Sequence, residues 1–444
     1  MIYLVCKKIY QVVKRMTKSY VTPTVHEFVE KINERCGEKH ANLAKIFDIT
    51  YTNTLETTLE EDQNHNVFVL TGDIPAMWQR DSTAQLRPYL IMEQSDPEIA
   101  ELILKVVKRQ FFNMNLDPYA NAFNLTDNGH GHQSDQTEMG PWIWERKYEL
   151  DSLCYPVQLA YLLYKNTGLT DQFDPTFVSA TKKLLEVIET EQHHENSTYR
   201  FERVEDRPED SLTHDGMGEP VAYTGMSWSG FRPSDDACVY GYLVPANMFA
   251  VVILRYLNEI FTTVLNEPTL AAQAEKLATE IHDGIEKYGT MTNERGEKIY
   301  AYEVDGLGNS LLMDDGNIPN LMSAPYLDYL AMDDPTYLAT RQTLLSHENP
   351  FYYSGTYGSG LGSPHTPENY IWPIALSIQG LTQPDRAEKL RLLELLANTT
   401  AGTNMMHEGF DVENPANFTR EWFSWANMMY CELLLDYLGM RVKK

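Results

Sequence analysis

Apolar residues recur every three or four positions along most of the chain, and runs that alternate like a β-strand are few. Asp96-Pro97, Asp174-Pro175 and Asp334-Pro335 each begin such a stretch. An acid followed by proline is typical of a helix N-terminus, because the acid caps free N–H groups and proline has none to satisfy. The pattern predicts an all-α chain. Its clearest apolar face lies between Glu267-Pro268 and Gly289 and consists of Leu270, Ala274, Leu277, Ile281, Ile285 and Tyr288.

Six segments between the helical stretches are rich in Gly, Asp, Pro and aromatic residues, and they contain all seven tryptophans. Flexible linkers are rich in Gly and Ser and do not carry tryptophan. We therefore expect ordered loops here and number them one to six along the chain. They cover about residues 71–82, 127–146, 223–240, 302–326, 351–373 and 405–425.

Six loops that alternate with helical pairs predict an (α/α)6 barrel of about twelve helices, with the active site at its loop-rich mouth. The units show little similarity to one another, so an open α-solenoid is the alternative. No linker divides the chain. We therefore expect one domain over residues 1–444, in which residues 1–22 form a flexible or peripheral extension.

The net charge of −27 argues against nucleic acid and anionic membranes as partners, because both need patches of Lys and Arg. Neutral ligands remain allowed, and 27 tyrosines suit surfaces that are half apolar and half polar, such as sugar-binding clefts. The cysteines are odd in number and lack C-x-x-C spacing, which predicts free thiols and a cytoplasmic location. They are Cys6, Cys36, Cys154, Cys238 and Cys431.

Loop one contains Asp73, Trp78, Arg80, Asp81 and Ser82 just before a helical stretch. A carboxylate beside a guanidinium and an aromatic ring can hold one hexose, because each sugar hydroxyl both donates and accepts. Asp81 or Ser82 could instead cap the helix.

Loop two contains His130, His132 and Gln133. The H-x-H spacing is neither H-E-x-x-H nor a cysteine-supported site, so it does not predict a metal centre. We expect these side chains to bind a sugar or each other. No Walker loop, dinucleotide fingerprint or nucleophile elbow occurs in the sequence, and we predict no cofactor.

Loops three and six carry the carboxylates best suited to acid–base chemistry. Asp235 and Asp236 are adjacent, and repulsion together with the nearby rings of Trp228 and Phe231 would raise one pKa, as a general acid requires. The pair could equally cap the next helix. Glu408 lies on a turn between His and Gly, where a structural Glu has little to do.

Together these loops closely resemble glycoside hydrolase family 125, the bacterial exo-α-1,6-mannosidases, over about residues 25–440. Long runs such as Ala76-Met77-Trp78 and Phe231-Arg232-Pro233-Ser234-Asp235-Asp236 carry the resemblance. It implies an (α/α)6 barrel that removes terminal non-reducing α-1,6-linked mannose from N-glycan-type mannosides, with inversion and without a metal. It also implies Asp235 as the acid, with Asp236 as the alternative, and Glu408 as the base.

Inverting glycosidases place two carboxyls about 6.5–9.5 Å apart, and loops three and six would face each other across the mouth. The expected partner is a mannose-containing oligosaccharide, and the expected state is a monomer or a weak homo-oligomer. The alternatives are an epimerase, lyase or glucosidase on the same barrel, or a non-catalytic glycan-binding protein. The candidate substrate-binding residues are Asp73, Trp78, Arg80, Asp81, Ser82, His130, Gln133, Arg232, Asp236 and His365.

Overall fold

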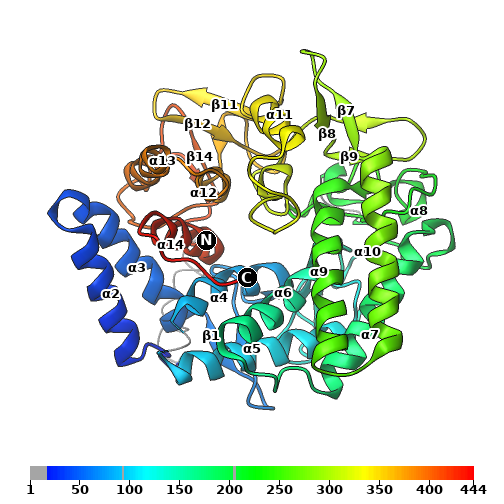
Figure 1. Cartoon of the computed structure of the whole chain (residues 1–444), viewed down its shortest axis with the longest axis horizontal. Helices are drawn as coiled ribbons and strands as arrows, with labels where there is room; N and C mark the ends of the chain where they lie inside the picture. The colour runs from blue at the N-terminus through cyan, green and yellow to red at the C-terminus, as the bar shows by residue number, and fades with distance from the viewer. Residues whose placement is uncertain (1–17, 93–94, 204–206) are drawn as a thin grey trace.

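The computed structural model describes residues 18–92, 95–203 and 207–444, and this part of the chain is mostly helical (Figure 1). Of the predicted extension over residues 1–22, residues 1–17 lie outside the described residues, and so does Cys6. Thirteen α-helices occur in the described ranges. They are α2 (Pro23–Cys36), α3 (Ala41–Thr57), α4 (Gln79–Leu86), α5 (Pro97–Leu116), α6 (Leu150–Thr167), α7 (Pro175–Glu191), α8 (Thr213–Gly216), α9 (Val244–Thr263), α10 (Pro268–Tyr288), α11 (Pro335–Leu344), α12 (Pro373–Leu381), α13 (Arg386–Asn398) and α14 (Ser424–Tyr437).

The helix starts predicted from acid-then-proline pairs are confirmed for α5, α7 and α11. Asp96 accepts hydrogen bonds from the first free N–H groups of α5, Asp174 does so for α7, and Asp334 for α11. The predicted apolar face of α10 is also confirmed, since all its members except Tyr288 are buried. Local sequence therefore determines where these helices begin and which face they bury.

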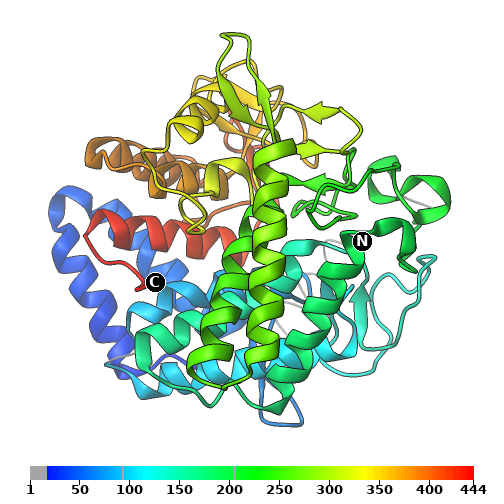
Figure 2. The same ribbon diagram turned by 45° about the vertical axis from the view of Figure 1, so that its right-hand side comes forward.

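The helices form two layers. In the inner layer α4, α6, α9, the 3-10 segment η5 (Leu321–Ser323), α12 and α14 each contact the next, and α14 contacts α4. Outside them lie α3, α5, α7, α10, α11 and α13. The chain passes around the molecule once, so that C-terminal α14 lies beside N-terminal α3 (Figure 1), and α10 runs along the outer side of α9 (Figure 2).

Helix α9 is long and apolar enough to cross a membrane, but 78% of its apolar window is buried inside the protein. Its neighbours are α6 on one side and α10 on the other. The apolar residues that surround it belong to one continuous core. This helix therefore has the burial of a core helix.

Short strands occupy the regions that we expected to be irregular loops. Three antiparallel three-stranded sheets each join two neighbouring loops, namely one with two, three with four, and five with six. Strands of two or three residues are too short to show alternation in the sequence. The sheets consist of β3 (Met77–Trp78), β4 (Ala122–Phe123) and β5 (Ile143–Glu145); β6 (Tyr242–Leu243), β9 (Glu303–Val304) and β10 (Ser310–Leu311); and β13 (Tyr370–Ile371), β14 (Gly409–Asp411) and β15 (Phe418–Thr419).

Three further hairpins complete the strands of the described residues, which number fifteen in all. They are β1 (Leu59–Glu61) with β2 (Val67–Val69), β7 (Thr290–Thr292) with β8 (Lys298–Tyr300), and β11 (Tyr352–Gly355) with β12 (Gly358–Leu361). Each hairpin forms a two-stranded sheet of its own, although β2 contacts β3, and β11 and β12 contact β13.

The Asp96 cap allows a stability prediction. Its buried carboxylate accepts from two N–H groups of α5 and from Thr22 Oγ1 at 2.5 Å, and Thr22 itself caps α2. Asp96→Ala should lower the free energy of unfolding by about 2–3 kcal/mol, because it removes a cap and leaves a buried hydroxyl without its acceptor. Asp174→Ala, which removes a cap alone, should cost only about 1 kcal/mol. Urea denaturation would measure both, and equal losses would contradict the prediction.

Candidate active site

A small cavity of about 40 Å³ lies where five of the six loops meet. Loop two contributes nothing to its lining. The lining residues are Thr71, Ile74, Trp78, Arg80, Asp81, Pro233, Ser234, Asp235, Asn317, His365, Trp372, Glu408, Arg420, Phe423 and Trp425.

Arg80 forms the charged floor of the cavity. It lies in the first turn of α4 and is 2% exposed. Its nitrogens lie 2.6 Å from Glu149 Oε2, 3.3 Å from Asp151 Oδ2, 3.5 Å from Asp81 Oδ1 and 3.8 Å from Asp235 Oδ1. One guanidinium therefore faces four carboxyls. Burial raises the pKa of Asp81 to about 6, although Arg80 and Arg420 oppose the shift.

A tight turn presents Asp235 to the cavity. Phe231 and Ala237 pair as an antiparallel bridge, and Arg232 N–H donates to the Asp236 carbonyl at 2.8 Å. Asp235 has φ of 69°, a left-handed conformation that is uncommon outside glycine and tends to occur at functional sites. The side chain of Asp235 lines the cavity and is 28% exposed, whereas that of Asp236 is 1% exposed and lies behind the wall.

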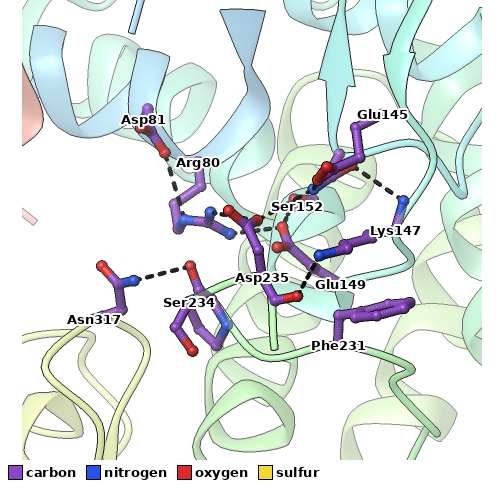
Figure 3. A network of polar contacts seen from close by, with 12 residues as sticks. Arg80, Asp81, Glu145, Lys147, Glu149, Ser152, Phe231, Ser234, Asp235 and Asn317 are labelled. Carbon is purple, nitrogen blue, oxygen red and sulfur yellow. Dashed lines mark hydrogen bonds and ion pairs between the residues drawn. The ribbon is translucent and has the colours of Figure 1, made fainter. Parts of the chain in front are cut away.

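Three contacts hold this turn in place, and Figure 3 shows those that Lys147 and Asn317 make. Lys147 Nζ donates to the Asp235 carbonyl at 2.6 Å, and Asn317 Nδ2 donates to the Pro233 carbonyl at 3.1 Å. Ser234 Oγ donates to Asp315 Oδ2 at 2.7 Å. Loops two and four therefore both determine where the loop-three carboxylate points.

The expected origin of an acidic proton on Asp235 was wrong. Trp228 stacks on His194 at 3.6 Å between ring centroids, away from the cavity lining, and Phe231 lies under Lys147. Burial raises the pKa of Asp235, but attraction to Lys147, Arg80 and His365 outweighs burial, so the net pKa is lowered. The proton that an acid catalyst needs must come from the surroundings of Asp235.

Asp236 acts as an anchor for His365. Its Oδ1 accepts from His365 Nδ1 at 3.0 Å and from Arg207 Nη2 at 2.8 Å. Burial lowers the pKa of His365, but the hydrogen bond and charge of Asp236, with help from Glu408 and Asp235, raise it to about 9. His365 therefore carries a positive charge at neutral pH and directs it into the cavity that it lines.

Glu408 lines the same cavity and comes from loop six. Its carboxylate lies 3.7 Å from Arg420 Nη1, and Arg420 also contacts Asp73 at 2.5 Å. Arg420 has φ of 50°, again left-handed. We did not predict Arg420 as a site residue, although a lone basic residue in an aromatic loop was a usable signal. Asp73 positions Arg420 and does not itself line the cavity.

Half of the predicted site residues come together at the cavity. Four other predicted substrate-binding residues lie elsewhere. Ser82 is buried and bonded to Gln79 and Gln110, and Arg232 is buried against Glu303 at 2.6 Å, so both support the walls from behind. His130 and Gln133 are exposed on loop two, where Gln133 donates to the Ile143 carbonyl. The predicted residues that do line the cavity are Trp78, Arg80, Asp81, Asp235, His365 and Glu408.

The two histidines of loop two also lack the surroundings of a metal centre. His132 Nε2 lies 3.6 Å from Glu145 Oε2. Within the described ranges, no group of three or more His, Cys, Asp or Glu side chains is arranged to hold a metal ion. This loop braces the site through β4 and β5 and through Lys147.

Polar atoms in the cavity wall are left without hydrogen-bond partners among the described residues. They are Trp78 Nε1 and Trp425 Nε1. Buried polar groups are nearly always paired, so two unpaired donors beside one cavity suit a ligand that carries hydrogen-bond acceptors, as sugar hydroxyls do. Aromatic rings beside them suit the apolar face of a sugar.

The raised pKa of His365 makes stability depend on pH. Its ordinary pKa is 6.5 and its folded value is about 9, so its stabilising contribution is complete below pH 6.5 and is lost as pH rises to 9. His365→Gln should therefore cost about 1–3 kcal/mol of unfolding free energy at pH 6, and the cost should shrink toward pH 9. Denaturant unfolding of both proteins across this range checks the prediction. A cost of His365→Gln that stays the same from pH 6 to pH 9 would contradict the prediction.

The known proteins to which this chain is similar include α-mannosidases, which agrees with a cavity suited to a sugar. The family model for metal-independent α-mannosidases of glycoside hydrolase family 125 matches residues 40–435. A Streptococcus pneumoniae metal-independent α-mannosidase, solved in a non-productive complex with α-1,6-mannobiose, is 54% identical, with a TM-score of 0.94 over 95% of this chain and 99% of that one.

Two more distant proteins are also similar. The meiotically up-regulated gene 157 protein of Schizosaccharomyces pombe is 38% identical over 95% of this chain and 87% of its own length. A solved glycosidase variant, 14% identical with a TM-score of 0.57, covers 91% of this chain and 99% of that one and shares the fold. The chain therefore belongs to glycoside hydrolase family 125, the metal-independent α-mannosidases.

Proposed function

We propose that this α-mannosidase removes terminal, non-reducing α-1,6-linked mannose from N-glycan-type mannosides with inversion of configuration. The observation that carries the proposal is the small cavity whose wall contains Asp235, Glu408 and unpaired donors on two tryptophans. The α-1,6-mannobiose bound by the Streptococcus pneumoniae relative supports the choice of linkage. The partner is then a mannose-containing oligosaccharide.

The family resemblance implies the two catalytic roles, and both carboxyls concerned line the cavity. Asp235 protonates the leaving oxygen, and Glu408 takes a proton from the water that attacks C1 from the opposite side. Asp236 is unsuited to the acid role because it is buried behind the wall and paired with His365 and Arg207. Arg80, Asp81 and His365 hold the sugar hydroxyls, and Trp78 provides an aromatic surface.

The proposal includes a closed (α/α)6 barrel around this site. The inner layer supports closure, since each of its members contacts the next and the last contacts the first. Five of the six inner positions are α-helices. The 3-10 segment η5 occupies the remaining one, between α9 and α12, and is stabilised by a capping box between Asn320 and Ser323. The likeness to glycosidases of low identity supports the same fold.

Four buried cysteines with free thiols support a reducing, cytoplasmic compartment for this protein. They are Cys36, Cys154, Cys238 and Cys431. The charge of −27 supports a neutral glycan rather than a nucleic acid as the partner.

Proton NMR of the first mannose released from α-1,6-mannobiose tests the proposal. We expect β-mannose as the initial product, with no effect of a chelator. Asp235→Asn and Glu408→Gln should each lower kcat about 10²- to 10⁴-fold, since each removes an acid or base from the transition state. Glu413→Gln is the matched control, because that exposed side chain bonds to Thr356 away from the cavity lining.

Each outcome of this experiment has a distinct meaning. Initial α-mannose would contradict inversion. No mannose release from this disaccharide, with release from an α-1,2 or α-1,3 isomer, would contradict the linkage. Full activity of Glu408→Gln would contradict its role as the base.

A further inference from the structure

Glu149 is a buried carboxyl beside the cavity that the proposed mechanism does not use. It immediately precedes α6, and its side chain is fully buried. Its Oε2 accepts from Arg80 Nη1 at 2.6 Å and from Ser152 Oγ at 2.7 Å. Its Oε1 has no N–H or O–H donor among the described residues. The Glu149 side chain is in hydrogen-bonding contact with a second carboxyl, that of Asp235, and both carboxyls face the Arg80 guanidinium.

Two carboxyls form a hydrogen bond only when one of them carries a proton. The charge balance around them favours the same. Arg80 lies within 3.8 Å of four carboxyls, namely those of Asp81, Glu149, Asp151 and Asp235. Lys147 and His365 also favour a charge on Asp235, and Arg420 favours one on Asp81, whereas Arg80 is the cation that acts on the buried carboxyls of Glu149 and Asp151. A proton on one of this buried pair therefore removes the least compensated charge.

The position of each carboxyl decides where that proton resides. Asp235 is partly exposed and has Lys147, Arg80 and His365 around it, all of which favour its charged form. Glu149 is shielded from solvent, and Asp235 and Asp151 repel a charge on it. Figure 3 shows the Asp235 and Glu149 carboxyls lying together between Arg80 and Lys147.

We propose that Glu149 is the proton-holding partner of Asp235, so that the two carboxyls share one proton and Glu149 supplies it when Asp235 protonates the glycosidic oxygen. This inference rests on the proposed role of Asp235. Burial raises the pKa of Glu149 well above its ordinary value, since it outweighs Arg80, and Asp235 and Asp151 raise it further. The pKa values of Asp81 and Asp151 rise only to about 6. The nearby thiol of Cys238 stays neutral, because burial raises its pKa, and so it adds no charge near Glu149.

The proton transfer balances as follows. The proton on Glu149 moves to Asp235, and Asp235 passes a proton to the glycosidic oxygen. As it does so, the C1–O bond breaks and its electron pair stays on that oxygen. Water adds to C1 and loses a proton to Glu408. Exchange with solvent returns that proton to the Glu149–Asp235 pair. One water is consumed in each turnover, and Glu149 acts as a positioning residue that touches no substrate.

Leaving-group dependence distinguishes this role from a structural one. The dinitrophenolate of 2,4-dinitrophenyl α-mannoside leaves C1 without being protonated. The mannose that leaves from α-1,6-mannobiose needs an acid to protonate its glycosidic oxygen. Glu149→Gln keeps the shape and the contact with Arg80 but carries no transferable proton. We expect kcat on mannobiose to fall about 10- to 100-fold, kcat on the dinitrophenyl substrate to change less than about threefold, and the alkaline limb of the mannobiose profile to move to lower pH.

Asp151→Asn is the matched control, because it alters the same Arg80 cluster at 3.3 Å without the carboxyl contact to Asp235. Because Asp151 repels a charge on Glu149, this variant should also slow mannobiose more than the dinitrophenyl substrate, but by a smaller factor than Glu149→Gln does. Equal losses on both substrates for Glu149→Gln, or no loss on either, would overturn the proposal. Asp235→Asn tests the acid assignment separately. If it also slows both substrates equally, then the assignment of Asp235 as the acid fails, whatever Glu149 does.

Infrared spectroscopy gives a readout that does not depend on turnover. At pH 7 the difference spectrum of wild type minus Glu149→Gln, recorded in H₂O and D₂O, should contain a protonated-carboxyl C=O band that shifts on deuteration. Buried Asp314, whose pKa burial raises to about 8, contributes to both proteins and cancels. A band for ionised carboxylate alone in the difference spectrum would overturn the proposal even if the variant were too unstable for kinetics.

Discussion

The contact on which the site depends is that of the Arg80 guanidinium with the carboxyls around it. A buried charge without partners is costly, and a partly paired cluster can be worse than an apolar core. Here the four carboxyls come from three places in the chain, with Asp81 beside Arg80 on α4, Glu149 and Asp151 at the start of α6, and Asp235 on loop three. Because Arg80 contacts all of them, these segments must come together before any is stable at this position.

The loops that carry these groups are held in pairs by the small sheets. The sheet of β3, β4 and β5 joins loops one and two, and Lys147, which follows β5, then reaches the Asp235 carbonyl. The sheet of β13, β14 and β15 joins loops five and six, which supply His365 and Glu408. Catalytic groups must be held firmly, and these backbone ladders provide rigidity where the chain would otherwise be loop.

The neighbours Asp235 and Asp236 show how backbone conformation divides two identical side chains between two tasks. The left-handed conformation at Asp235 sends its carboxyl into the cavity, while Asp236 points behind the wall, where it keeps His365 charged. His365 in turn lowers the pKa of Asp235 and so favours a resident proton on Glu149. Asp236 thus influences the acid indirectly through a single imidazole.

The sequence by itself determined the helices, since periodicity and acid-then-proline caps are local signals that hold for α5, α7, α10 and α11. Its loop motifs also identified the family and six of the fifteen residues that line the cavity. Only the tertiary structure decided that His130 and Gln133 lie away from the cavity lining, that Arg420 belongs to it, and which proton partner Asp235 has. Those outcomes depend on distances between loops remote in sequence and on burial of charge, and neither quantity is a property of local residue patterns.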